Sequence, residues 1–230
     1  MANEGKHKES AQPEIVSHTH NSLRLPFWEK NGKKLIYGAS AVVLLIAGYF
    51  AYHSYVVAPK EEKAAAALWK AEQYFRMDSS SLALNGDGPN QGLLKIISRY
   101  DGTKAGNLAK FYAASSYMNL GDFNNALKYL KDFSTDDPLI RVRATGLLAD
   151  ALAETGKKKE AAETYKKAGT SFDKDDLNSP EYLFRAGLLY EDLGSNQDAI
   201  AMFTLIKNKY PTSERGAEVE KYLARLGQLK

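Results

Sequence analysis

The sequence contains no cysteine, which excludes disulfides, thiol nucleophiles and thiolate metal ligands. Histidine is scarce as well, and residues 54–230 contain none. His18 and His20 flank Thr19, but two histidines alone make a poor metal site. We therefore predict no metal and no cofactor. Carboxylates such as Asp150 and Glu154 are interpreted as solvated helix faces, so the chain is predicted not to be an enzyme.

Basic and acidic residues are nearly balanced on both sides of the apolar run. Residues 1–34 carry six basic and four acidic side chains, and residues 60–230 carry 25 basic and 24 acidic ones. Nucleic-acid binding requires a concentrated basic surface. We therefore expect no nucleic-acid partner.

One long apolar run is present, in "FWEKNGKKLIYGASAVVLLIAGYFAYHSYVVAPKEEK" from Phe27 to Lys63. Residues 35–57 hold no Asp, Glu, Lys or Arg, and a helix of this length crosses a hydrocarbon core of about 30 Å. A signal peptide has an apolar core of only about 7–15 residues. We predict an uncleaved transmembrane helix over 35–57; the alternatives are a cleaved signal and a buried helix of a soluble domain.

The flanks of this run predict its direction. Lys33 and Lys34 abut its start, and basic residues favour the cytoplasmic side of a membrane. Residues 1–34 are predicted to be a flexible cytoplasmic tail, and the rest of the chain to lie outside. Aromatic residues such as Phe27 and Trp28 suit the headgroup region.

The chain after the run is predicted to be all-α and repetitive. "GDFNNA", "GKKKEA" and "GSNQDA" each end one helical stretch and open another, and their alanines, at 126, 161 and 199, are 35 and 38 residues apart. Paired helices with a period near 34 are the tetratricopeptide signature. The prediction is an α-solenoid of three repeats, at 107–140, 142–175 and 180–213, closed by a C-terminal capping helix with Thr212 or Ser213 as N-cap.

The domain boundaries follow from these segments. Residues 58–104 are expected to form a linker helix and a degenerate helical hairpin around the turn-rich "SSSLALNGDGPN", and residues 105–230 the three repeats and the cap.

The first helix of each repeat is expected to line a partner-binding groove with apolar ends and an acidic middle. An equally weighted alternative is that its apolar residues pack between repeats. The candidate groove residues are Leu108, Phe111, Ser115, Met118, Asn119, Arg143, Asp150, Glu154, Phe184, Leu188 and Glu191.

The stretch around the membrane run resembles the amino-terminal signature of the YfgM-like family, ancillary subunits of the bacterial SecYEG translocon. Phe27, Asn31, Gly32 and Lys33 carry the match, and Trp28 and Lys34 complete the anchor motif. The resemblance implies a single-pass protein of the bacterial inner (cytoplasmic) membrane with a periplasmic repeat domain. It also implies SecYEG subunits and a periplasmic prolyl-isomerase-type chaperone as partners. Membrane lipid is expected around the apolar run, and the groove is expected to engage a soluble or translocating polypeptide.

Two functions remain open at this point. One is a non-catalytic interaction module at the Sec translocon, acting on secreted proteins. The other is an envelope-assembly scaffold that oligomerises through its repeats. Their partner sets distinguish them.

Overall fold

The computed structural model describes residues 25–228 and divides the chain into two units, Met1–His53 and Ser54–Lys230. The described part of the first unit is the helix α1, Leu25–Tyr52. Its residues 33–52 are solvent-exposed, Leu44 and Leu45 by more than 70 %. The helical run Phe27–Arg76 contains the one segment, among the described residues, that is long and apolar enough to cross a membrane. Residues 25–34, which were predicted to be flexible tail, are helical.

The second unit opens with three helices that precede the hairpins. A π-helical turn, His53–Val57, begins at the last residue of the first unit and is followed by α2 (Ala58–Arg76), α3 (Ser80–Asn85) and α4 (Leu93–Arg99). Residues 80–85 of the turn-rich "SSSLALNGDGPN" form the helix α3. Ala83 and Leu84 are buried against Leu93 and Ile96, and this burial outweighs the turn-forming composition.

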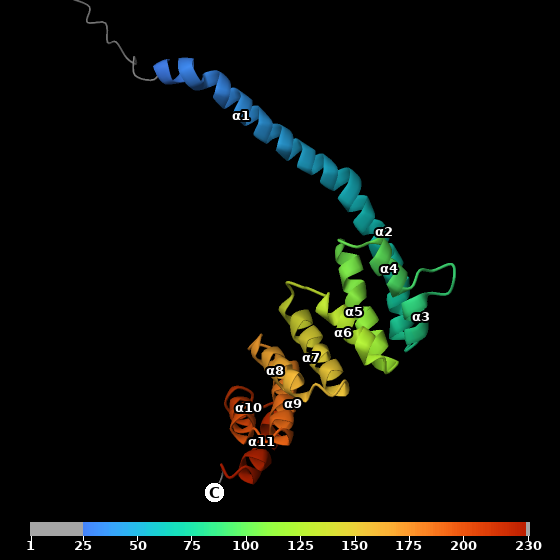
Figure 1. Cartoon of the computed structure of the whole chain (residues 1–230), viewed down its shortest axis with the longest axis vertical. Helices are drawn as coiled ribbons and strands as arrows, with labels where there is room; N and C mark the ends of the chain where they lie inside the picture. Colours follow the sequence, from blue (N-terminus) through green and yellow to red (C-terminus); the bar gives the residue numbers. More distant parts are fainter. Residues whose placement is uncertain (1–24, 229–230) are drawn as a thin grey trace, which may run out of the picture. The chain divides into compact units, whose positions relative to one another are not determined.

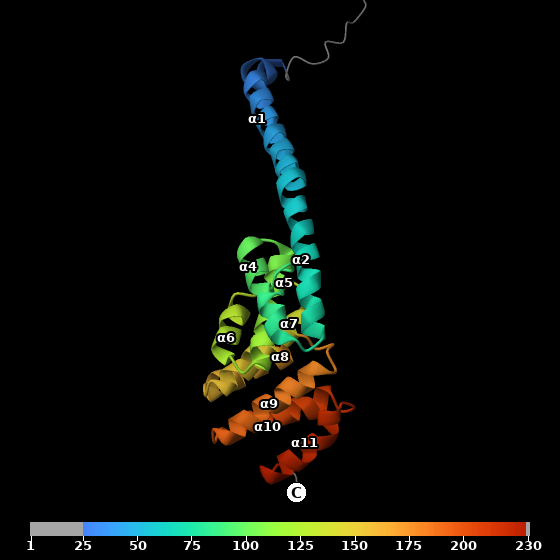
Figure 2. The ribbon, with the colours of Figure 1, turned by 90° about the vertical axis from the view of Figure 1, so that its right-hand side faces the viewer.

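Six further helices form three antiparallel hairpins, and a last helix closes the array (Figures 1 and 2). Within the described residues there is no β-strand, so the chain is all-α as predicted. The hairpin helices are α5 (Lys104–Asn119) with α6 (Phe123–Lys131), α7 (Pro138–Glu154) with α8 (Lys158–Thr170), and α9 (Asn178–Asp192) with α10 (Asn196–Lys209); the closing helix is α11 (Glu214–Arg225).

Glycine and alanine have the roles that the repeat pattern predicts. Gly121, Gly156 and Gly194 follow the first helices with φ between 73° and 77°, a left-handed conformation that favours glycine at a helix C-terminus. The alanines at 126, 161 and 199 are fully buried. Side chains larger than methyl have no room where the two helices of a hairpin meet.

Each helix packs mainly against its sequence neighbours, which produces two hydrophobic cores in this unit. One core lies among α2, α3, α4 and α5, and the other runs from α5 to α11. Tyr117 and Tyr129 pack against both cores, with rings stacked 5.7 Å apart at an interplanar angle of 6°. This tyrosine pair joins the two cores at the first hairpin.

The first turn of α2 is fixed to the start of α5. The Glu61 carboxylate accepts hydrogen bonds from the backbone N–H groups of Lys104 (2.8 Å) and Ala105 (2.9 Å). Thr103, the N-cap of α5, accepts a third from Gly106 (2.9 Å). Lys60 donates to the Asp101 carbonyl at 2.7 Å. A carboxylate is favoured here by both the unpaired N–H groups and the helix dipole.

The helix α11 covers the last hairpin, as predicted for a cap. Ser213 is its N-cap and accepts from the Gly216 N–H at 3.0 Å. Leu223 is buried, and Tyr222 packs edge-on against Phe184 with ring centroids 4.9 Å apart. The exposed end of a solenoid needs such a cover.

Candidate partner-binding surfaces

The candidate groove residues of α5 lie on one partly buried side of that helix. Leu108, Phe111, Ser115 and Met118 are half-buried, and Asn119 is exposed. The Phe111 ring packs against Phe133, with centroids 5.5 Å apart. The Ser115 hydroxyl donates to the Phe111 carbonyl, so it is occupied within its own helix. This side of α5 is accessible only in part.

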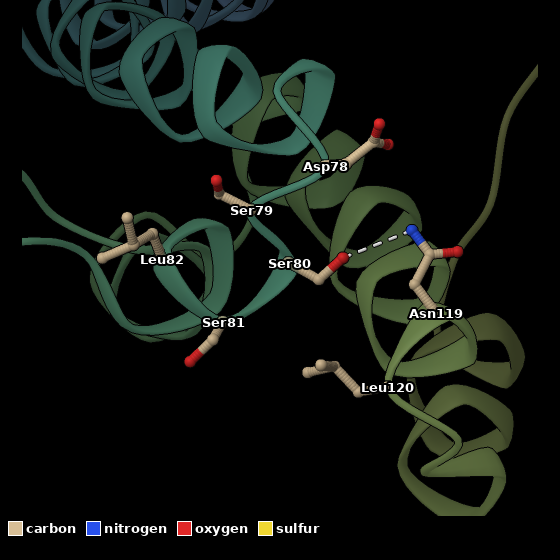
Figure 3. A pocket seen from close by; sticks show the side chains of 7 residues that line it. All are labelled: Asp78, Ser79, Ser80, Ser81, Leu82, Asn119 and Leu120. Carbon is tan, nitrogen blue, oxygen red and sulfur yellow. Dashed lines mark hydrogen bonds between the residues drawn. The ribbon is translucent and has the colours of Figure 1, made fainter.

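Asn119 opens onto a different depression, formed with α3 (Figure 3). Its side-chain amide donates to the Ser80 hydroxyl at 3.2 Å. The exposed apolar side chains of Leu82 and Leu120 also line this depression, and Asp78 is the single charged residue of the lining. The bond ties the end of α5 to α3.

On α9, Phe184 packs between helices, which was the alternative to binding a partner. Its ring is 4 % exposed and packs against Phe203 and Tyr222, and the Arg215 guanidinium lies 4.4 Å from its centroid. The helix α11 covers it, so the expectation that Phe184 faces a partner is wrong. Leu188, by contrast, is 37 % exposed.

In the acidic middle of the predicted groove, arginines form ion pairs with several of the carboxylates. Asp150 of α7 pairs with Arg185 of α9 at 2.6 Å, and Glu181 pairs with both Arg185 (2.8 Å) and Arg215 of α11 (2.6 Å). Glu191 pairs with Arg225 at 2.5 Å. Arg143 and Glu154 are exposed. The predicted acidic middle therefore carries arginine charges among its carboxylates.

The pKa values reflect this network. Burial opposes ionisation of Glu181, but hydrogen bonds from Arg215 and Arg185 outweigh it and lower the pKa of its carboxyl. Burial and a hydrogen bond to Asp150 raise the pKa of the Tyr165 hydroxyl. Burial also raises the pKa of Tyr182. At neutral pH the Glu181 carboxylate is therefore ionised and both tyrosines are neutral, which suits a structural ion-pair network.

A cavity of about 450 Å³ lies beside the network, between α7, the start of α9 and the start of α11. Four carboxylates and two guanidiniums line it, together with the Tyr182 ring. A Cβ on Gly146 would lie about 2.0 Å from that ring, so only glycine allows it to sit there. The lining residues are Asp150, Asp176, Leu177, Asn178, Pro180, Glu181, Tyr182, Arg185, Ser213, Glu214 and Arg215.

Arg185, Arg215 and Arg225 were not among the candidate residues, although a sequence signal existed. Glu181 and Arg215 are 34 residues apart, as are Glu191 and Arg225. Positions one repeat apart lie side by side in a solenoid. Opposite charges at the repeat spacing therefore mark the ion pairs between the last hairpin and the closing helix.

The anchor motif lies on the first turns of α1. Phe27 and Trp28 are 57 % and 59 % exposed, with their rings edge-to-face at 6.5 Å. Asn31 and Gly32 are half-buried, and Lys33 and Lys34 are exposed. Nothing within the described residues 25–228 gathers three or more His, Cys, Asp or Glu side chains as a metal site would.

Comparisons with known protein families identify tetratricopeptide repeats in this chain. The profile of the tetratricopeptide repeat-like domain matches residues 26–149, which is more than half of the chain and includes α1. Two tetratricopeptide repeat profiles match residues 142–168 and 181–213, which fall on the second and third hairpins. No curated protein and no solved structure gave a match. The chain belongs to the tetratricopeptide repeat-like domain family.

Proposed function

We propose that this protein is a membrane-tethered protein–protein interaction module, an ancillary subunit of the Sec translocon of the YfgM-like kind. In this proposal α1 is an uncleaved anchor in the bacterial inner membrane, its N-terminus is cytoplasmic, and the repeats work in the periplasm with a prolyl-isomerase-type chaperone on secreted proteins.

One observation supports the proposal that α1 is a permanent membrane anchor. The family profile begins at residue 26, so it covers the apolar helix and the first helices of the repeat domain as one unit. A signal peptide is removed from the mature protein and is not part of its fold. A segment that belongs to the family's domain is better explained as a permanent part of the protein. Lys33 and Lys34 support the proposed direction.

The contact of Glu61 with α5 supports a functional tether. Residue 61 follows the predicted span by only four positions, and it already belongs to the packed repeat unit. A short connection confines the repeats near the membrane and raises their effective concentration at a membrane partner. Weak individual contacts then suffice for occupancy.

The test is affinity recovery of the tagged full-length protein in mild detergent, read by mass spectrometry. The matched control replaces residues 35–57 with an unrelated single-span helix, so the repeats stay on a membrane. Recovery of SecYEG subunits and a periplasmic isomerase with the native chain, and loss of SecYEG with the control, supports the proposal. Envelope-assembly proteins, or only further copies of the chain, would support the scaffold function instead.

A further inference from the structure

The first hairpin differs from the others in the length of its second helix. The helix α6 has nine residues, whereas α8 has 13 and α10 has 14. After α6 the chain runs as an irregular loop, residues 132–137, to α7 (Figure 1). The second helices of this array are therefore not equivalent.

The loop 132–137 is held against α5. The Asn107 side chain donates to the Ser134 carbonyl at 2.6 Å and accepts from the Ser134 N–H at 3.3 Å. The Phe133 ring packs against Phe111, and Lys110 pairs with Asp132 at 2.6 Å. These contacts give the loop a defined position.

A cavity of about 450 Å³ lies where α6, this loop, α7 and α8 meet; we call it the outer cavity. Its lining includes apolar groups, among them the buried Leu130 and Ala144 and the half-buried Leu148 and Phe133. The hydroxyls of Thr145 and Thr164 also line it, but each donates to a carbonyl of its own helix at 2.7 Å. Much of the lining therefore offers apolar contact.

Three cations and no carboxylate line the outer cavity. They are Lys131, Arg141 and Lys167, and none of them takes part in the ion pairs found within residues 25–228. Arg141 donates instead to the neutral Asp136 carbonyl at 2.9 Å, and Asp132, next to Lys131, is paired with Lys110. The other three cavities described for this chain each contain carboxylates that equal or outnumber their cations.

The outer cavity lies on the opposite side of α7 from the predicted groove. At about 100° per residue, Arg141, Thr145 and Leu148 share one face of the helix. Arg143, Asp150 and Glu154 project about 180° away from them. The two faces can be tested separately on one helix.

We propose that the outer cavity binds an acidic segment of a partner protein, with an apolar side chain placed on the Leu130–Leu148 floor. Three unpaired cations around an apolar surface complement carboxylates that flank a leucine or phenylalanine. A phosphate or a lipid headgroup would use the cations and leave the floor unused. This inference goes beyond the membrane role proposed above, since it requires no membrane partner.

The experiment uses the full-length protein in detergent and a peptide library displayed on phage. Selected peptides are resynthesised with a fluorescent label, with Gln replacing Glu in one version and Ser replacing the apolar residue in another. Arg141→Glu and Arg143→Glu are the paired variants, since both residues are exposed arginines of α7. Circular dichroism establishes that both variants are folded.

Acidic-apolar peptides are expected from the selection, with binding weakened by about tenfold or more in Arg141→Glu and by less than about twofold in Arg143→Glu. Both altered peptides are expected to bind weakly. The proposal is overturned if the selection yields no acidic peptides, or if Arg143→Glu is the variant that loses binding. It is also overturned if inorganic phosphate displaces the peptide while the Ser version binds as well, since the site would then recognise any anion.

Discussion

Glu61 provides the sharpest test of how the start of α2 is held to the repeats. In Glu61→Gln one oxygen remains to accept a hydrogen bond, but the other is replaced by an NH₂ group that cannot accept one. One N–H of the first turn of α5 then loses its partner, and the negative charge at this helix N-terminus is lost.

The expected cost follows from these two losses. A hydrogen bond to a charged group contributes about 1.5–3 kcal/mol, and a charge at a helix terminus about 0.3–1 kcal/mol. Because Glu61 is only half-buried, we expect a total of about 2 kcal/mol. At 1.4 kcal/mol per factor of ten, this predicts that local opening of the first turn of α5 rises about 30-fold.

Hydrogen exchange read by mass spectrometry measures this opening directly at the amides of Lys104 and Ala105. The control is Glu62→Gln, which removes the same charge from the adjacent, exposed position. Exchange in α9 is expected to be unchanged in both variants, because solenoid helices respond mainly through their neighbours. Equal exchange of the α5 amides in the two variants would refute the role of Glu61 as the hydrogen-bond partner of these amides.

Three further predictions concern the repeats. Phe203→Ala should lower the free energy of unfolding by about 3–5 kcal/mol, since the ring is fully buried, and denaturant titration measures this. Gly156→Ala should cost about 1–2 kcal/mol because φ is 77° there, whereas Lys157→Ala next to it should cost much less; thermal denaturation compares them. Glu181→Gln should reduce the pH dependence of stability. Its folded pKa lies below the ordinary 4.5, so its stabilising effect is present above pH 4.5 and is lost as the pH falls through the folded value. Melting temperatures that fall equally in acid for variant and wild type would contradict this.

The features that the sequence predicts well are those that depend on local physics. Gly121 and Ser213 follow from rules for helix ends, and Ala126 follows from the spacing of the repeats. The helix α3 was missed because burial of Leu84, a tertiary effect, overrides a turn-rich composition. Burial of Phe184 was one of two alternatives, and the choice between them depends on where α11 lies.

The ion pairs and the outer cavity could not be predicted from the sequence, because they depend on how one hairpin packs on the next. Arg185 reaches Asp150 across 35 residues, so local periodicity on α9 does not reveal it. The outer cavity depends on the early end of α6 and on the way Asn107 holds the following loop. Neither feature is visible in the composition of a single segment. The partner and the membrane orientation stay proposals.

The short α6 makes one position along the repeat array different from the others. In a solenoid of identical repeats, a ligand can shift by one repeat and find the same surface again. Here α6 is shorter than α8 and α10, so the surface beside it is not repeated along the array. A partner segment that fits the outer cavity can therefore bind at one position only.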